Sequence, residues 1–213
     1  MIDTKYFKMY NNKEFWDKEV IKMKVILASQ SPRRAALMDL IKIDFEVLPS
    51  KHEREIKNGS NIEEQAIEVA YQKALEVYNN TQGDRAIIGA DTIVVKDNKV
   101  YGKPKDREDA IRMLKELEGE FHAVYTSLAI IIENHGKVEE YKEVVKTTIK
   151  VKDITDDEII EYVDNERPYD KAGSYAIQSC FCKFIEKIDG NYMSVIGLPV
   201  DRVYEILRDN EVI

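Results

Sequence analysis

The chain has 213 residues, of which 44% are hydrophobic and 34% charged, and its formal net charge is −8. This composition is typical of a globular protein with one substantial core, and the acidic balance argues against a nucleic-acid partner, because general nucleic-acid binders usually carry excess positive charge. No apolar run approaches the ~18 residues that cross a bilayer, and the first residues lack the apolar stretch of a secretory signal. We therefore expect no membrane partner and a cytoplasmic location.

The segment from Lys24 to Leu40 predicts a buried strand, a turn of small residues and a helix. Ser31 suits the N-cap of this helix and Pro32 its first position, where the missing N–H costs nothing. Arg33 and Arg34 then lie in the first turn, where positive charge opposes the helix dipole. A bound anion would remove this conflict, so the segment indicates either an anion site or a pair of solvated arginines.

A second strand is predicted over Ile43–Leu48, because apolar and polar residues alternate there. After a polar loop, a long helix is expected over Ile62–Tyr78, capped by Ser60 or Asn61. Lys73 is the one cation on the apolar stripe of this helix. Its side chain either extends to solvent, which the pattern alone favours, or points into a site.

The most strand-like segment is Ala86–Val95, which contains Asp91 and Thr92. An aspartate inside an aliphatic strand is costly to bury unless something pairs with it, and such positions are typical of metal ligands, acid–base groups or buried ion pairs. We expect a functional role for Asp91. The hairpin that follows leads into Gly102-Lys103-Pro104, which would hold Lys103 next to the strand of the aspartate.

The rest of the chain continues to alternate helices and strands. We expect a helix over Asp106–Glu118, strands over Phe121–Ile132 and Val138–Val151, a capped helix over Asp156–Val163, a strand over Phe184–Ile188 and a final helix after Gly197. The segment Arg167–Gln178 is rich in small residues and suits a ligand-facing loop. Without repeats or linkers, the simplest organisation is an amino-terminal arm over 1–22 and a single domain over 23–213.

Six motifs, read together, resemble the Maf family of nucleoside triphosphate pyrophosphatases from about Lys24 to Asn210. They are LASQSPRR at 27–34, GADT at 89–92, GKP at 102–104, DKAG at 170–173, IQ at 177–178 and IDGNYMSVIGLP at 188–199. The resemblance implies an α/β fold of the Maf/ITPase-like type, with a long mixed β-sheet flanked by helices and two lobes around a central cleft. Family members are often dimers, which makes a homodimer possible.

The resemblance also implies a reaction, namely hydrolysis of dTTP or UTP to the nucleoside monophosphate and pyrophosphate, with modified pyrimidine nucleotides as further candidate substrates. A divalent cation, Mg or Mn, is the expected cofactor. The catalytic residue and metal ligand of the family falls on Asp91, and the residues tied to base preference fall on Arg33, Thr92 and Gln178. The residues expected to bind the phosphates are the cations Arg33, Arg34, Lys73, Lys103 and Lys171 and the turn from Ser29 to Ser31.

Two features of the sequence depart from the family pattern. The family usually has Gly-Ile-Gln-Gly where this chain has Ala176-Ile177-Gln178-Ser179, which adds bulk beside the expected base pocket. Its acidic loop corresponds here to KHERE at 51–55, so that Glu53 or Glu55 could take the acidic role. The alternatives are the branch of the family that acts on 7-methyl-GTP, and a non-catalytic nucleotide-binding regulator of septum formation. A Rossmann dehydrogenase is disfavoured, because no G-x-G-x-x-G follows the first strand.

Overall fold

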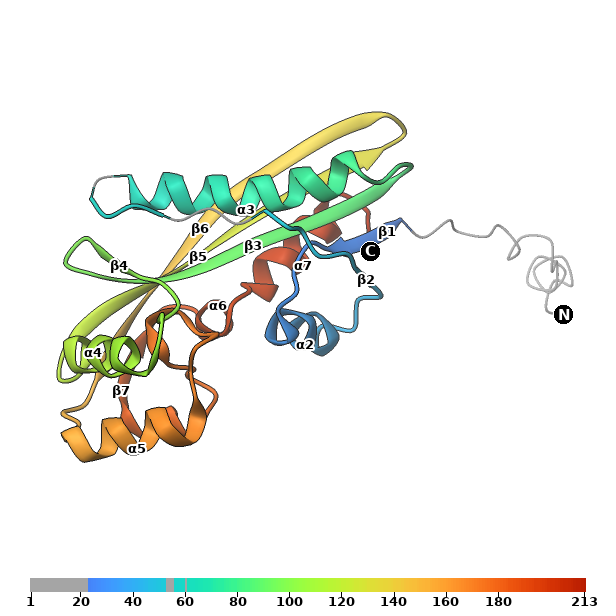
Figure 1. Cartoon of the computed structure of the whole chain (residues 1–213). Helices are drawn as coiled ribbons and strands as arrows, with labels where there is room; N and C mark the ends of the chain where they lie inside the picture. The colour runs from blue at the N-terminus through green and yellow to red at the C-terminus, as the bar shows by residue number, and fades with distance from the viewer. Residues whose placement is uncertain (1–22, 53–55, 60) are drawn as a thin grey trace, which may run out of the picture.

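The computed structural model describes residues 23–52, 56–59 and 61–213. The expected arm over 1–22, Ser60 and the acidic candidates Glu53 and Glu55 lie outside the described residues. The described chain forms one mixed sheet in the order β2-β1-β3-β5-β6-β7, with β4 paired to β3 (Figure 1). Strands β1, β2 and β3 are parallel to one another, and all other pairs are antiparallel.

The strands are β1 (Lys24–Leu27), β2 (Glu46–Val47), β3 (Arg85–Lys96), β4 (Lys99–Tyr101), β5 (Phe121–Asn134), β6 (Lys137–Val151) and β7 (Ile185–Asp189). The α-helices are α2 (Pro32–Leu40), α3 (Ile62–Asn79), α4 (Arg107–Leu117), α5 (Asp156–Glu166), α6 (Tyr192–Ile196) and α7 (Val200–Asp209). Two 3₁₀ helices, η2 (Ala172–Ser174) and η3 (Cys180–Phe184), interrupt the loop before β7. None of these helices is long and apolar enough to span a bilayer.

Most of the predicted elements are confirmed within a few residues, and their caps explain where some of them begin. The Asp106 side chain caps α4, and Thr155 forms a capping box with Glu158 at the start of α5. Asn61 precedes α3 in a left-handed conformation, without a side-chain cap. The second strand is shorter than predicted, because only Glu46 and Val47 pair with the short strand β1 and both are exposed.

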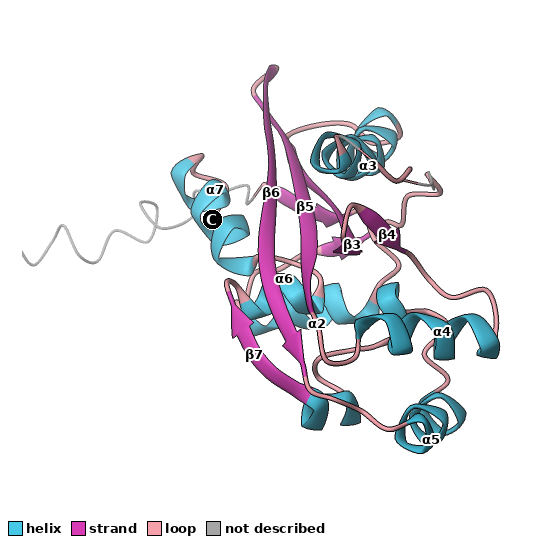
Figure 2. Cartoon of the chain, turned by 90° about the vertical axis from the view of Figure 1, so that its left-hand side faces the viewer, coloured by secondary structure: helices cyan, strands magenta, loops and turns pink. Residues whose placement is uncertain are grey.

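The two faces of the sheet are covered differently. Helix α3 lies along one face, whereas two separate groups of helices cover the other (Figures 1 and 2). One of these groups, with α2 and α7, forms a core around Ile88, Leu128 and Leu198. The other, with α4 and α5, forms a core around Val94 and other buried residues such as Val124 and Ile149. These groups are two lobes built on the same sheet.

A gap along the edge of β3 lies between the two lobes. Strand β1 pairs with β3 only as far as Ile88, and β4 begins to pair at Val94. The residues between these positions, 89–93, pair with β5 on one side and with neither strand on the other. Asp91 is in the middle of this gap. The sequence predicts that Asp91 lies inside a strand, and the structure shows that one edge of the strand has no neighbouring strand among the described residues at this point.

Candidate active site

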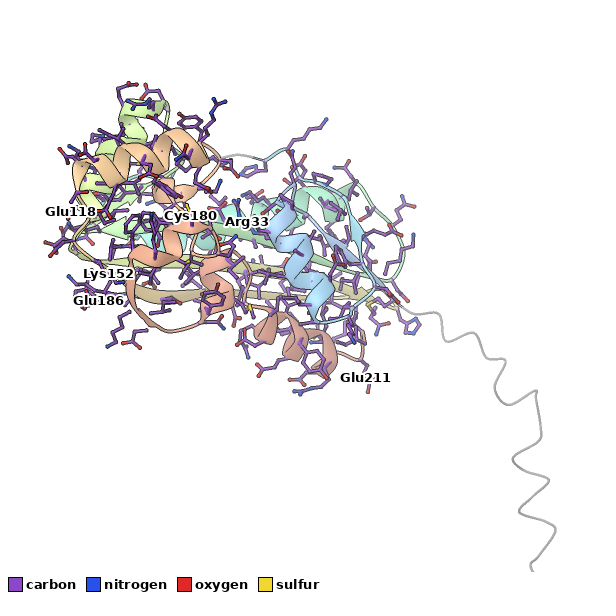
Figure 3. All side chains as sticks on the ribbon, turned by 90° about the horizontal axis from the view of Figure 1, so that it is seen from below. Arg33, Glu118, Lys152, Cys180, Glu186 and Glu211 are labelled. Atoms are coloured by element: carbon purple, nitrogen blue, oxygen red, sulfur yellow. The ribbon has the colours of Figure 1, made fainter. Side chains whose placement is uncertain are left out.

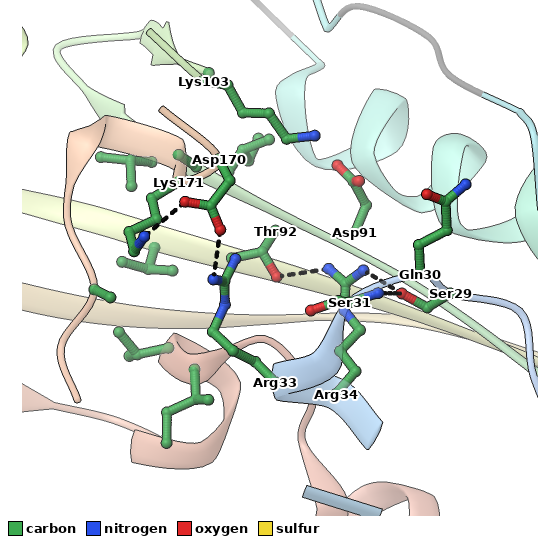
Figure 4. A pocket seen from close by; sticks show the side chains of 18 of the residues that line it. Ser29, Gln30, Ser31, Arg33, Arg34, Asp91, Thr92, Lys103, Asp170 and Lys171 are labelled. Carbon is green, nitrogen blue, oxygen red and sulfur yellow. Dashed lines mark hydrogen bonds and ion pairs between the residues drawn. The ribbon is translucent and has the colours of Figure 1, made fainter. Parts of the chain in front are cut away.

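A cavity of about 720 Å³ opens at the gap beside β3 and extends between the two lobes. This volume is in the range of small-molecule and cofactor sites. Apart from Glu53 and Glu55, which lie outside the described residues, all the residues that the sequence singled out for the site line this cavity: Ser29, Ser31, Arg33, Arg34, Lys73, Asp91, Thr92, Lys103, Lys171 and Gln178. They come from segments far apart in the chain, and Figure 4 shows most of them converging on one space.

Lys73 does not extend to solvent, so the interpretation favoured by its helical pattern is wrong. Its Nζ lies 2.5 Å from Oδ1 of Asp91, and the two side chains are 17% and 21% exposed. The physical reason is that α3 packs directly against β3, which places this turn of the helix over the gap. The ion pair provides the partner that an aspartate in an aliphatic strand needs.

Arg34 connects the α2–α7 lobe to the strand that carries Asp91. Its guanidinium donates hydrogen bonds to Oγ of Ser29 at 3.0 Å, to Oγ1 of Thr92 at 3.2 Å and to the carbonyl of Gly197 at 2.8 Å. Burial lowers the pKa of Arg34 from its usual value, and the nearby charge of Asp91 opposes this shift. Arg34 therefore fixes the turn after β1, the middle of β3 and the turn before α7 relative to one another.

Arg33 is more exposed than Arg34 and pairs across the cavity. Its guanidinium lies 3.0 Å from Oδ2 of Asp170, whose other oxygen accepts from Lys171 at 2.6 Å. Burial alone would raise the pKa of Asp170, but the hydrogen bonds from Lys171 and Arg33 lower it to about 2. Figure 3 shows Arg33 at the start of α2.

Sequence reasoning did not assign a role to Asp170 or to Glu76. Asp170 lies next to Lys171 in the DKAG motif, and its place in that motif could have indicated a role in the site. Glu76 lies one helical turn after Lys73 on α3, and its Oε2 accepts from the hydroxyl of Ser50 at 2.5 Å and from the backbone N–H groups of Lys51 and His52. The hydroxyl of Ser50 and these N–H groups lower the pKa of Glu76. Ser50 and His52 both line the cavity, so Glu76 holds part of its wall.

Part of the cavity lining is apolar. On the side of the α4–α5 lobe, which we call the apolar end, the cavity is lined largely by apolar and small side chains together with Gln178. These are Val94, Val124, Ala172, Tyr175, Ala176, Ile177, Val195 and Ile196. Ser179, which replaces a family glycine, donates its hydroxyl to the carbonyl of Ala176 at 2.9 Å, so its side chain is engaged within the loop.

The charge of the cavity is opposite to that of the whole chain. Among the described lining residues, five are cations (Arg33, Arg34, Lys73, Lys103 and Lys171), whereas the acids are Asp91 and Asp170. The described residues contain no cluster of three or more His, Cys, Asp or Glu side chains that could hold a metal ion. A metal at this site would therefore depend on Asp91 and on oxygen atoms of the ligand, a combination that suits Mg²⁺.

The sequence of this chain is similar to sequences of known proteins. Residues 24–210 match the family described as Maf-like protein. A dTTP/UTP pyrophosphatase of Thermoanaerobacter sp. (strain X514) is 41% identical over 187 residues, covering 87% of this chain and 96% of that protein. The dTTP/UTP pyrophosphatase of Acetivibrio thermocellus is 42% identical, with 88% and 95% covered, and that of Aquifex aeolicus is 41% identical, with the same coverage.

Among solved structures, the nucleoside-triphosphatase / dITP/XTP pyrophosphatase of Mycobacterium abscessus is similar over 61% of this chain and 74% of its own. The TM-score is 0.40 and the sequence identity is 16%.

Proposed function

The chain belongs to the Maf family, and on this premise we propose that it is a nucleoside triphosphate pyrophosphatase that hydrolyses dTTP and UTP to the monophosphate and pyrophosphate. Relatives about 40% identical over nearly their whole length carry the name of this activity. Their names favour it over action on 7-methyl-GTP and over a non-catalytic role in septum formation.

The observation that carries the proposal is the Lys73–Asp91 pair in the wall of a cationic cavity. Hydrolysis of a phosphoanhydride requires a positioned water and neutralisation of the charge that develops on the leaving pyrophosphate. Asp91 is the carboxylate available to orient the water or to hold the metal ion. Lys73 contacts one oxygen of that carboxylate and fixes its direction.

The cations around Asp91 are the proposed binding groups for the triphosphate. Arg33 can make directional, bidentate contacts to phosphate oxygens, whereas Lys103 and Lys171 act closer to point charges. Arg34 already donates to three protein acceptors, so we assign it mainly to holding the site together. The turn from Ser29 to Ser31 lies at the start of α2, where backbone N–H groups favour anions.

A divalent cation would be held by Asp91 and the phosphate oxygens of the substrate. When bound, Mg²⁺ or Mn²⁺ would neutralise phosphate charge and activate the attacking water. Asp91 alone would supply few metal ligands, and the phosphate oxygens of the nucleotide would supply others. The affinity for the metal should therefore depend strongly on bound nucleotide.

The apolar end of the cavity is the proposed base subsite. Gln178 offers both a hydrogen-bond donor and an acceptor, which suits the imide edge of thymine or uracil. Thr92 also lines the cavity, and its hydroxyl accepts from Arg34 and is 3.1 Å from that of Thr126. Thr92 would therefore contact the nucleotide either through its methyl group or through a hydroxyl that Arg34 and Thr126 already hold in place.

The test is to incubate the protein with dTTP, UTP and a panel of other triphosphates in the presence of Mg²⁺ or Mn²⁺. We expect equal amounts of pyrophosphate and monophosphate, a preference for dTTP and UTP, and loss of turnover with a chelator. Release of inorganic phosphate and a nucleoside diphosphate, or nucleotide binding without turnover, would contradict the proposal.

A further inference from the structure

A buried hydrogen bond behind the apolar end of the cavity joins two residues to which nothing above gives a role. Nε2 of His122, on β5, lies 2.7 Å from the hydroxyl of Tyr175, which is the residue directly after the 3₁₀ helix η2. The residues are 3% and 6% exposed. The rings meet edge to face with centroids 5.5 Å apart. This contact fastens the loop after η2 to a central strand of the sheet.

Tyr175 is also fixed from its other side. Its ring packs on Phe181 with centroids 4.8 Å apart, and Phe181 in turn contacts Tyr162 and Phe184. Tyr175 begins the segment 175–178, and all four residues of that segment line the cavity. The rings limit where the Tyr175 side chain can lie, while the hydrogen bond to His122 sets its hydroxyl end.

His122 does not line the cavity, so it would act through Tyr175. Among the described residues, Nδ1 of His122 is buried and has no hydrogen-bond partner, which leaves the Tyr175 hydroxyl as the polar contact of the ring. Burial, assisted by the charge of Lys96, lowers the pKa of His122 to about 4. The ring is therefore neutral near pH 7 and serves as a hydrogen-bonding partner.

The chemistry of an amide explains why this segment needs to be fixed. A glutamine side chain can present either its oxygen or its NH₂ group, and a rotation exchanges the two. Thymine and uracil present an N–H donor at N3 and a carbonyl at C4, whereas cytosine presents an acceptor at N3 and an amino group. Gln178 would therefore discriminate between these bases only if its orientation and its backbone are held.

We propose that His122 and Tyr175 form a positioning pair that holds Gln178 for recognition of the imide edge, and so sets the preference of the enzyme for thymine and uracil over cytosine. This proposal rests on the proposed function and deepens it. Neither residue touches the reacting phosphates, so removing the pair should change selectivity between bases far more than the chemistry itself.

The test compares kcat/KM for dTTP with kcat/KM for dCTP in Tyr175→Phe, which removes one hydroxyl and preserves the ring. We expect the ratio to fall at least fivefold, mainly because dTTP is used less well. His122→Leu should lower the ratio similarly, and the double variant should add little, because both changes break the same contact. Tyr141→Phe is the matched control, since its hydroxyl bonds to Asn210 away from the cavity.

The ratio separates a positioning role from a general loss of stability, because unfolding reduces turnover of both substrates equally. A dTTP/dCTP ratio in Tyr175→Phe within twofold of the wild-type ratio would overturn the proposal, as would a wild-type ratio near one. Calorimetric binding of non-hydrolysable α,β-methylene analogues of dTTP and dCTP gives the same ratio without turnover. A wild-type protein without pyrophosphate release would thus refute the proposed function, while the binding ratio still tests the pair.

Discussion

The backbone of Ala70 occupies the space where a side chain on Gly89 would lie. A Cβ atom at Gly89 would be 2.3 Å from the carbonyl oxygen of Ala70 and 2.8 Å from the backbone nitrogen of Ala74. Glycine at this position lets α3 lie directly on β3, and small residues on the helix complete the close approach. Lys73, between these two alanines on α3, is thereby brought to Asp91, two residues beyond Gly89 on β3.

Gly89→Ala should therefore weaken both the fold and the ion pair. The new methyl group has no room unless the helix moves, and we expect a loss of about 1–3 kcal/mol in the free energy of unfolding, as for overpacked cores. Urea unfolding measures this loss. Gly102→Ala is the control for stability, because a Cβ there meets nothing within 4 Å, and it should change the free energy by less than about 0.5 kcal/mol. Equal stability of the two variants would refute the close-packing argument.

Lys73→Met should reduce turnover while preserving the fold. The substitution keeps the length of the side chain but removes the charge that contacts Asp91 and faces the triphosphate, so we expect kcat/KM for dTTP to fall by about 100-fold. Steady-state kinetics and circular dichroism provide the measurements. A Lys73→Met enzyme with normal kcat/KM would mean that the ion pair is purely structural.

Glu76→Ala should loosen the segment from Ser50 to His52, which forms part of the cavity wall. The carboxylate is the common acceptor for the hydroxyl of Ser50 and two backbone N–H groups, so its loss leaves these donors to solvent and the segment less ordered. We expect KM for dTTP to rise about tenfold with a small change in melting temperature, and Glu76→Gln to recover part of the loss. Glu68→Ala, on the same helix but bonded to Gln72, should leave KM unchanged. Identical kinetics of the two alanine variants would disprove this role.

The buried ring of His122 should make stability depend on pH. The pKa of His122 is lowered to about 4 in the folded state, against about 6.5 in the unfolded chain. Above pH 6.5 neither state binds the proton. As pH falls from 6.5 towards 4, the unfolded state gains it first, and stability decreases by up to about 3 kcal/mol.

Chemical denaturation at a series of pH values measures this dependence. In His122→Gln, the decrease between pH 6.5 and pH 4 should be smaller by the contribution of the histidine, whatever the absolute stability of the variant. An unchanged pH slope would show that the histidine titrates equally in both states.

Local signals in the sequence were sufficient for much of the fold. The aliphatic run before Ser29, the alternation within β6 and the capping box at Thr155 each reflect contacts within one element, and the structure confirms those elements. The extent of the second strand could not be predicted in this way. Its length depends on how far β1 extends beside it, which is a property of the sheet.

Contacts between distant segments were the part of the site that local patterns missed. The pattern of α3 alone predicts a solvated Lys73, because nothing in that local pattern shows that α3 packs onto β3 at Gly89. The partners of Asp170 and Glu76 likewise belong to segments far away in the chain, Arg33 and Ser50. The motif resemblance identified the residues that line the cavity, but not which of them hold one another in place.

The most direct test of the central claim is the rate of pyrophosphate release from dTTP by Asp91→Asn, measured with saturating nucleotide and Mg²⁺ beside the wild-type protein. The substitution preserves the shape of the side chain and removes its charge, so a folded variant should turn over at least about 100-fold more slowly. Pyrophosphate release by a folded Asp91→Asn variant at the wild-type rate would contradict the assignment of the catalytic carboxylate.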